Sequence, residues 1–80
     1  MAHVNKVARS IETDDGGRCV DIFVRPDGTF GFEEYRRDVE DGRGWFPIGD
    51  YAGQIFADRD AALTAASLKV AWLADLLGKA

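Results

Sequence analysis

The residues of this chain that are best suited to nucleophilic chemistry are its single histidine, His3, and its single cysteine, Cys19. Nucleophilic catalysis needs an activated side chain with a base within reach. His3 lies at the N-terminal end, and Cys19 has no activating neighbour in the sequence, so we expect Cys19 to serve packing. One histidine and one cysteine also fall short of the usual zinc site. We therefore expect no cofactor and no metal.

Paired carboxylates, which can perform general acid–base chemistry, occur at Asp14-Asp15, at Glu33-Glu34 and at Asp58 with Asp60. Each pair has an ordinary structural position, in a loop, on a sheet surface or at a helix start. The short stretch Gly42-Arg43-Gly44 lacks the length and the strand-to-helix context of a phosphate-binding loop. The sequence therefore predicts a protein without catalytic activity.

Basic and aromatic side chains form a second candidate set, one that would suit nucleic-acid contact. The set comprises Arg25, Arg36, Arg37, Arg43 and Trp45. Acidic residues are interleaved with it, at Glu33, Glu34, Asp38, Glu40 and Asp41. The whole chain has a net charge of −4, whereas nonspecific binding to nucleic acid needs a cationic field. Nucleic-acid binding through the sheet face and hairpin loops is therefore the alternative function, not the first.

The composition is that of one globular domain. The chain has 80 residues, 46% hydrophobic and 30% charged. A single cysteine excludes an intramolecular disulfide and suits a reducing compartment. We find no signal peptide and no apolar stretch long enough to span a membrane, so we expect a cytoplasmic protein.

The strands that must position these residues begin with residues 18–25, where apolar side chains alternate at period two. Pro26, Asp27 and Gly28 then predict a three-residue hairpin loop in which Gly28 adopts a positive φ. This loop predicts that Val24 faces Phe30 and Ile22 faces Phe32 on the core side. It also predicts that Phe23 faces Gly31, Asp21 faces Glu33 and Cys19 faces Tyr35 on the other side.

The second strand is expected to run to about Val39, with a bulge at Glu33-Glu34 that returns Tyr35 or Val39 to the core side. A loop over residues 40–44 leads to a third strand at about 45–48 and to an extended piece at 54–56. Residues 1–17 are expected to be flexible or loosely packed. Their apolar positions fit either one helical face or, for residues 7–11, a short strand.

The glycine-free segment from about Arg59 to Leu77 predicts one long helix with Asp58 as its N-cap and Gly78 as its C′ residue. One stripe of the helix, expected to pack on the sheet, comprises Ala62, Ala66, Val70, Leu73 and Leu77. The prediction is a single α+β domain over residues 18–80. It consists of a three-stranded antiparallel sheet (β-β-β-α) packed by that helix, with room for an extra short N-terminal element.

A second apolar stripe remains on this helix, and it includes Leu68, Trp72 and Leu76. Three strands can cover only one side of a helix. Either Val4, Val7 and Ile11 fold over Trp72, or the stripe is an interface for a second copy or another protein. The sequence therefore favours a non-catalytic, self-associating protein–protein interaction domain.

Two resemblances add to this prediction. Through residues 28–35 (GTFGFEEY), 44–45 (GW) and 56–62 (FADRDAA), the part of the chain from 18 to 77 resembles small bacterial domains built as a β-meander plus a helix, which have no assigned activity. Residues 54–77 are similar to the end of HicB-like antitoxins, which implies an oligomeric, toxin-neutralising regulator. The chain departs from that family because it lacks the Pro-Gly element before the last strand, for which residues 45–49 (WFPIG) are a loose counterpart, and because it shows no DNA-binding extension.

Overall fold

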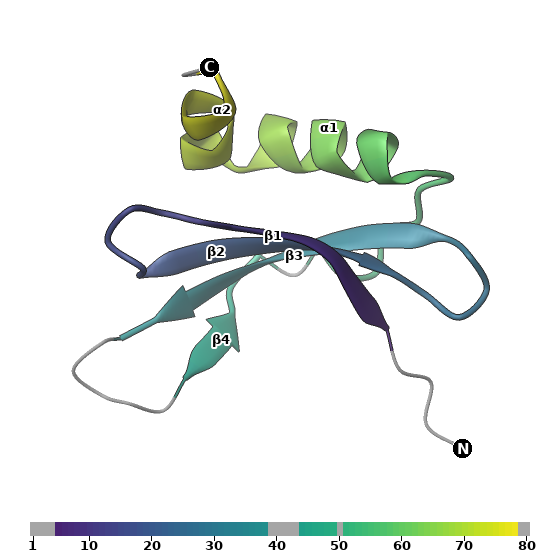
Figure 1. The fold of residues 1–80 in the computed structure, drawn as a ribbon, viewed down its shortest axis with the longest axis horizontal. Helices are drawn as coiled ribbons and strands as arrows, with labels where there is room; N and C mark the ends of the chain where they lie inside the picture. Colours follow the sequence, from purple (N-terminus) through teal and green to yellow (C-terminus); the bar gives the residue numbers. More distant parts are fainter. Residues whose placement is uncertain (1–4, 39–43, 50, 79–80) are drawn as a thin grey trace.

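The computed structural model describes residues 5–38, 44–49 and 51–78. Its elements are strands β1 (Lys6–Glu12), β2 (Arg18–Val24), β3 (Phe30–Arg37) and β4 (Trp45–Pro47), followed by helices α1 (Arg59–Lys69) and α2 (Ala71–Leu77). The strands form one antiparallel sheet in the order β1-β2-β3-β4, and both helices lie on the same side of it (Figure 1). The domain is therefore α+β in two layers, and no described helix covers the other face of the sheet.

The β2–β3 hairpin confirms the register predicted from its turn. The Arg25 N–H donates to the Thr29 carbonyl at 2.8 Å, and Gly28 has a φ of +88°, which glycine adopts without strain. Val24 pairs with Phe30 and Ile22 with Phe32. Local turn chemistry therefore decides which side chains of β2 and β3 face the helices.

The predicted number of three strands is wrong, because residues 6–12 add a fourth strand, β1, along β2. The register shifts between Val7 and Arg9, so that Val7 lies opposite Phe23 while Ile11 lies opposite Val20. This shift sends Val7 and Ile11 to opposite faces. Ile11 is buried in the core and Val7 is 59% exposed, so the helical alternative for these residues is wrong.

Two further details of the sheet differ from expectation. The pairing of β2 with β3 is continuous from Arg18 to Val24, so no bulge occurs at Glu33-Glu34 and Tyr35 stays on the face away from the helices. The extended piece at 54–56 makes only one bridge, between Phe56 and Phe30. Val39 lies outside the described residues.

The core lies between the sheet and the helices, and the stripe predicted to face the sheet is confirmed. The large side chains that are fully buried in this core are Val20, Ile22 and Phe32 from the sheet and Leu73 from α2. Ala62 and Ala66 have no exposed surface, so these small residues let α1 approach the strands closely.

The predicted single helix is interrupted at Val70, which is extended (φ −113°, ψ 102°) and separates α1 from α2. Neither proline nor glycine marks this break, although a β-branched residue has low helix propensity. Val70 itself is buried in the core. The predicted N-cap is confirmed, since Asp58 accepts a hydrogen bond from the Ala61 N–H at 2.7 Å. Gly78 ends the helical segment as predicted, but as the C-cap of α2 with a φ of −76°, and not as the C′ residue.

Candidate functional site

The break at Val70 divides the second apolar stripe of the helix. Leu68, near the end of α1, is 81% exposed. Trp72 and Leu76, on α2, are half-buried against the core and line a shared hollow of about 230 Å³. Leu68 is not part of the lining of this hollow. The structure therefore brings two of the three predicted interface residues together and leaves the third beyond the break.

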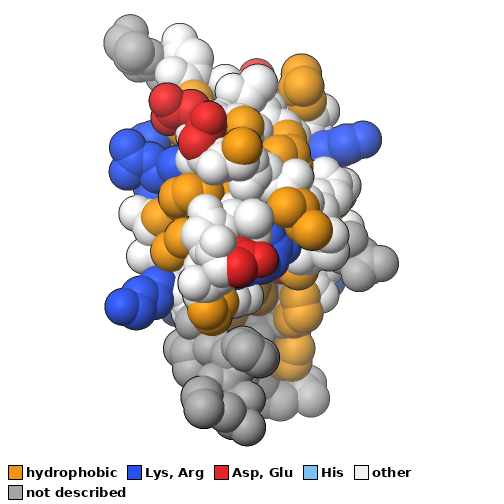
Figure 2. Space-filling view, turned by 90° about the vertical axis from the view of Figure 1, so that its right-hand side faces the viewer, with side chains coloured by type: hydrophobic (Ala, Val, Ile, Leu, Met, Phe, Trp, Pro, Cys, Tyr) orange, Lys and Arg blue, Asp and Glu red, His pale blue; other side chains and the backbone are white. Residues whose placement is uncertain are grey.

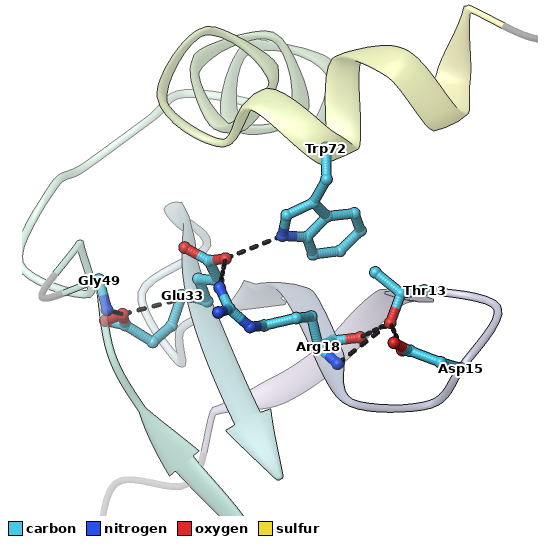
Figure 3. Close-up of polar contacts among 7 residues, drawn as sticks. Thr13, Asp15, Arg18, Glu33, Gly49 and Trp72 are labelled. Atoms are coloured by element: carbon cyan, nitrogen blue, oxygen red, sulfur yellow. Dashed lines mark hydrogen bonds and ion pairs between the residues drawn. The ribbon is translucent and has the colours of Figure 1, made fainter.

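Trp72 is held in place by a polar contact with the sheet (Figure 3). Its Nε1–H donates to Glu34 Oε2 at 2.9 Å, and Arg18 Nη1 lies 3.6 Å from the same oxygen. Glu34 is almost buried, so this contact satisfies a carboxylate that would otherwise be costly to bury. The indole is therefore fixed with one edge toward the sheet.

The β1–β2 loop borders the hollow beside Trp72, and Ile11 of β1 lies in the buried core against which Trp72 packs. Thr13 and Asp14 line the hollow beside Trp72. The Thr13 hydroxyl donates to Asp15 at 2.6 Å and accepts from the Arg18 N–H at 3.1 Å (Figure 3). Val7 faces away from the helices and therefore does not cover Trp72. Val4 lies outside the described residues.

Arg25, a candidate for nucleic-acid contact, is committed to bonds within the chain. Its guanidinium donates to the carbonyl oxygens of Phe30, Ala52 and Gln54 at 2.7–2.9 Å. It also lies over the ring of Phe23, 5.0 Å from the centroid. These contacts give Arg25 a structural role that its sequence position did not indicate.

The other candidates of that set are dispersed. Arg37 lies over the Trp45 ring, 4.5 Å from its centroid, and Arg37 Nη2 donates to the Gly16 carbonyl at 3.0 Å. Arg36 is exposed and pairs with Arg18 on the side of the helices, whereas Arg37 and Trp45 face the other way. Arg43 lies outside the described residues. The described members of this set therefore do not form one basic surface.

Glu33 is the side chain that sequence reasoning misplaced most, since it was expected on a solvated surface. It is only 3% exposed. Its carboxylate accepts hydrogen bonds from the backbone N–H groups of Gly49, Tyr51 and Ala52 at 2.9–3.4 Å, and from its neighbour Glu34 at 3.2 Å (Figure 3). The only sequence signal was the like-charge pairing of Glu33 with Asp21 across the strands.

Two charged side chains together hold the segment that follows β4. The Glu33 carboxylate accepts hydrogen bonds from the backbone N–H groups of this segment at Tyr51 and Ala52. The Arg25 guanidinium donates to the backbone carbonyl groups of the same segment at Ala52 and Gln54. This segment lies between the β4 ladder and the single bridge at Phe56, so side chains replace the missing backbone ladder. It also carries Tyr51, whose ring lies 5.0 Å from that of Phe32.

The sheet face that the helices leave uncovered has a hollow of about 230 Å³, to which every strand contributes. Its lining comprises Ser10, Glu12, Cys19, Asp21, Tyr35 and Trp45. Cys19 Sγ donates to Asp21 Oδ1 and lies close to Ser10 Oγ, at 3.2 Å in each case. The predicted strand positions of Cys19 and Asp21 are therefore correct, but the hollow needs β1 and β4 as well.

The chemistry of this hollow is that of a binding site more than of a nucleophilic one. Burial raises the pKa of the Cys19 thiol to about 11, so the thiol is protonated at neutral pH and is a weak nucleophile. Glu33 is not part of the lining, and His3 lies outside the described residues. In the part of the chain that the structure describes, no three side chains of the metal-binding types are grouped to hold an ion.

Within the described ranges, neither helix is long and apolar enough to cross a lipid bilayer. Comparison of the chain with protein-family models, with curated proteins and with solved structures finds no match. The two resemblances noted in the sequence therefore stay predictions.

Proposed function

We propose that the chain is a non-catalytic, cytoplasmic protein–protein interaction domain that associates with a second copy through the side of α2 and the end of α1. The observation that carries this proposal is the position of Trp72, which is half-buried beside a hollow and fixed by its bond to Glu34. Tryptophan is enriched among the residues that dominate binding energy. A side chain that is already held loses little conformational entropy on association.

The exposure of Leu68 supplies the complementary part of this interface. At 81% exposed it is the most exposed of the large hydrophobic residues in the described ranges. The helix break places it outside the hollow that Trp72 and Leu76 line, so Leu68 of one copy can enter the hollow of the other. A two-fold axis makes this contact twice and buries both leucines, which is the commonest arrangement in soluble oligomers.

Charge fits the same arrangement. Asp14 and Asp75 lie on the rim of the hollow, and Lys69 follows Leu68 at the end of α1. When Leu68 enters the partner's hollow, Lys69 is carried toward those carboxylates. Opposite charges at the rim favour correct orientation more than they raise affinity.

Leu68→Glu tests this interface without touching the core, because the side chain is exposed. We expect wild-type protein to show a mass above that of the monomer in sedimentation velocity at high concentration, and Leu68→Glu to sediment as a monomer. The reason is that a carboxylate entering an apolar hollow has to be desolvated.

Ile55→Glu is the matched control, because Ile55 is 70% exposed and precedes α1. Figure 2 views the side of the molecule that carries the β2–β3 hairpin and the start of α1, where hydrophobic side chains lie in separate groups among charged ones. We expect Ile55→Glu to keep the wild-type mass. A monomeric wild type at every concentration would refute the proposal, as would equal masses for the two variants.

A further inference from the structure

We infer that the hollow on the uncovered sheet face binds a single alkylammonium group, in a site formed by Asp21, Glu12, Ser10 and the rings of Tyr35 and Trp45. This site lies on the opposite side of the sheet from α2 and the Trp72 hollow (Figure 1). It therefore does not rest on self-association, and either proposal can fail alone.

The hollow carries two carboxylates, Asp21 and Glu12, that take part in no ion pair within the described ranges. Arg37 of β3 lies over the Trp45 ring and donates to the Gly16 carbonyl. A cation entering the hollow therefore meets carboxylates whose charge is still available.

Two titratable groups in the hollow are affected by this charge. Burial raises the pKa of the Tyr35 phenol, and the negative charges of Asp21 and Glu33 raise it further. The pKa of Cys19 is raised chiefly by burial, with a contribution from Asp21. Both groups are therefore neutral at pH 7 and leave the carboxylates as the charges of the site.

The acceptors and rings suit an ammonium group on an alkyl chain. An ammonium has three donors, and Asp21, Glu12 and the Ser10 hydroxyl offer oxygen acceptors. The chain of the ligand can pack on Tyr35 and Trp45, and aromatic rings also attract cations.

The volume of the hollow and its oxygen acceptors distinguish this site from a pocket for a drug-sized ligand and from a calcium site. At about 230 Å³ the hollow is smaller than the pockets of roughly 300–1,000 Å³ that hold drug-sized ligands, so it fits one side chain or a small amine. Calcium takes about six to eight oxygen ligands, more than two carboxylates and a hydroxyl provide. The alkylammonium group that the hollow binds is found on a lysine side chain of a partner protein and on free alkylamines.

Nuclear magnetic resonance titration of the full chain tests this inference. The probes are n-butylammonium chloride, the tripeptide acetyl-Ala-Lys-Ala-amide, and n-butanol as the uncharged control, all at matched ionic strength. We expect saturable shifts of the Trp45 indole N–H signal with one or both ammonium probes and none with n-butanol. Binding of the free amine would assign the site to small amines, and binding of the peptide alone would assign it to a lysine of a partner.

Asp21→Asn is expected to weaken that binding by about tenfold or more, because it removes one of the two carboxylates that line the hollow. Glu12→Gln is a second variant, which we expect to leave the fold unchanged because Glu12 is exposed, and to weaken binding as well. Asp75→Asn is the charge-matched control on the helix side and should bind as wild type does. The inference is overturned if neither ammonium probe shifts the Trp45 signal saturably, if n-butanol acts equally, or if all three variants bind alike.

Discussion

Glu33→Ala is expected to lower the free energy of unfolding by about 3–5 kcal/mol, because four backbone N–H groups, one buried and three part-buried, lose one shared acceptor. Folded domains have about 0.05–0.15 kcal/mol of stability per residue, so this loss is a large part of the total for a chain of 80 residues. Urea unfolding followed by far-ultraviolet circular dichroism measures the change.

Two further variants make this test specific. Glu12→Ala removes an exposed carboxylate from the same sheet and is expected to change the free energy of unfolding by less than about 0.5 kcal/mol. Glu33→Gln keeps one acceptor oxygen, but its side-chain NH₂ group faces the backbone N–H groups that the second oxygen accepted from. We therefore expect a loss in the free energy of unfolding between the losses of Glu12→Ala and Glu33→Ala. A Glu33→Ala protein as stable as Glu12→Ala would show that the carboxylate does not hold the 49–52 segment.

Trp72→Ala is the change with the second-largest expected effect, about 2–4 kcal/mol, because it removes a half-buried aromatic side chain and its bond to Glu34. In a domain of this size each kcal/mol shifts the melting temperature by about 4–8 °C, so thermal unfolding resolves the effect easily. Glu34 would keep only its contact with Arg18, at 3.6 Å.

Trp72→Phe separates the two parts of this effect, since it keeps most of the apolar surface and removes only the Nε1 donor. We expect it to cost about 1–2 kcal/mol, the usual range for leaving a nearly buried polar group with one partner fewer. If Trp72→Ala melts at the wild-type temperature, the indole does not anchor α2 to the sheet. Because Trp72→Ala also weakens the fold, Leu68→Glu is the better probe of association.

The predictions that the structure confirms depend on local sequence. The β2–β3 register follows from the turn at Pro26–Gly28, and the N-cap follows from Asp58 and the residues directly after it. Both are decided within a few residues by backbone conformation and hydrogen bonding. The stripe of α1 that faces the sheet is likewise a matter of helical periodicity.

The features that sequence reasoning missed depend on distant contacts. Because the register shifts after Val7, the side chains of β1 do not keep a period-two alternation along the whole strand, and the sequence pattern does not reveal the strand. The break at Val70 carries no proline or glycine, and Val70 is extended and buried in the core. The role of Glu33 depends on a segment 16–19 residues away, and the hollow beside Cys19 depends on all four strands.

The central claim, that a second copy docks its Leu68 beside Trp72, is tested most directly by isotope-filtered nuclear Overhauser spectroscopy. The sample mixes carbon-13-labelled and unlabelled chains at a concentration where sedimentation shows association. We predict intermolecular signals between the Leu68 methyl groups of one chain and the Trp72 indole or Leu76 methyl groups of the other. Intermolecular signals confined to other surfaces, or none at all, would contradict the claim.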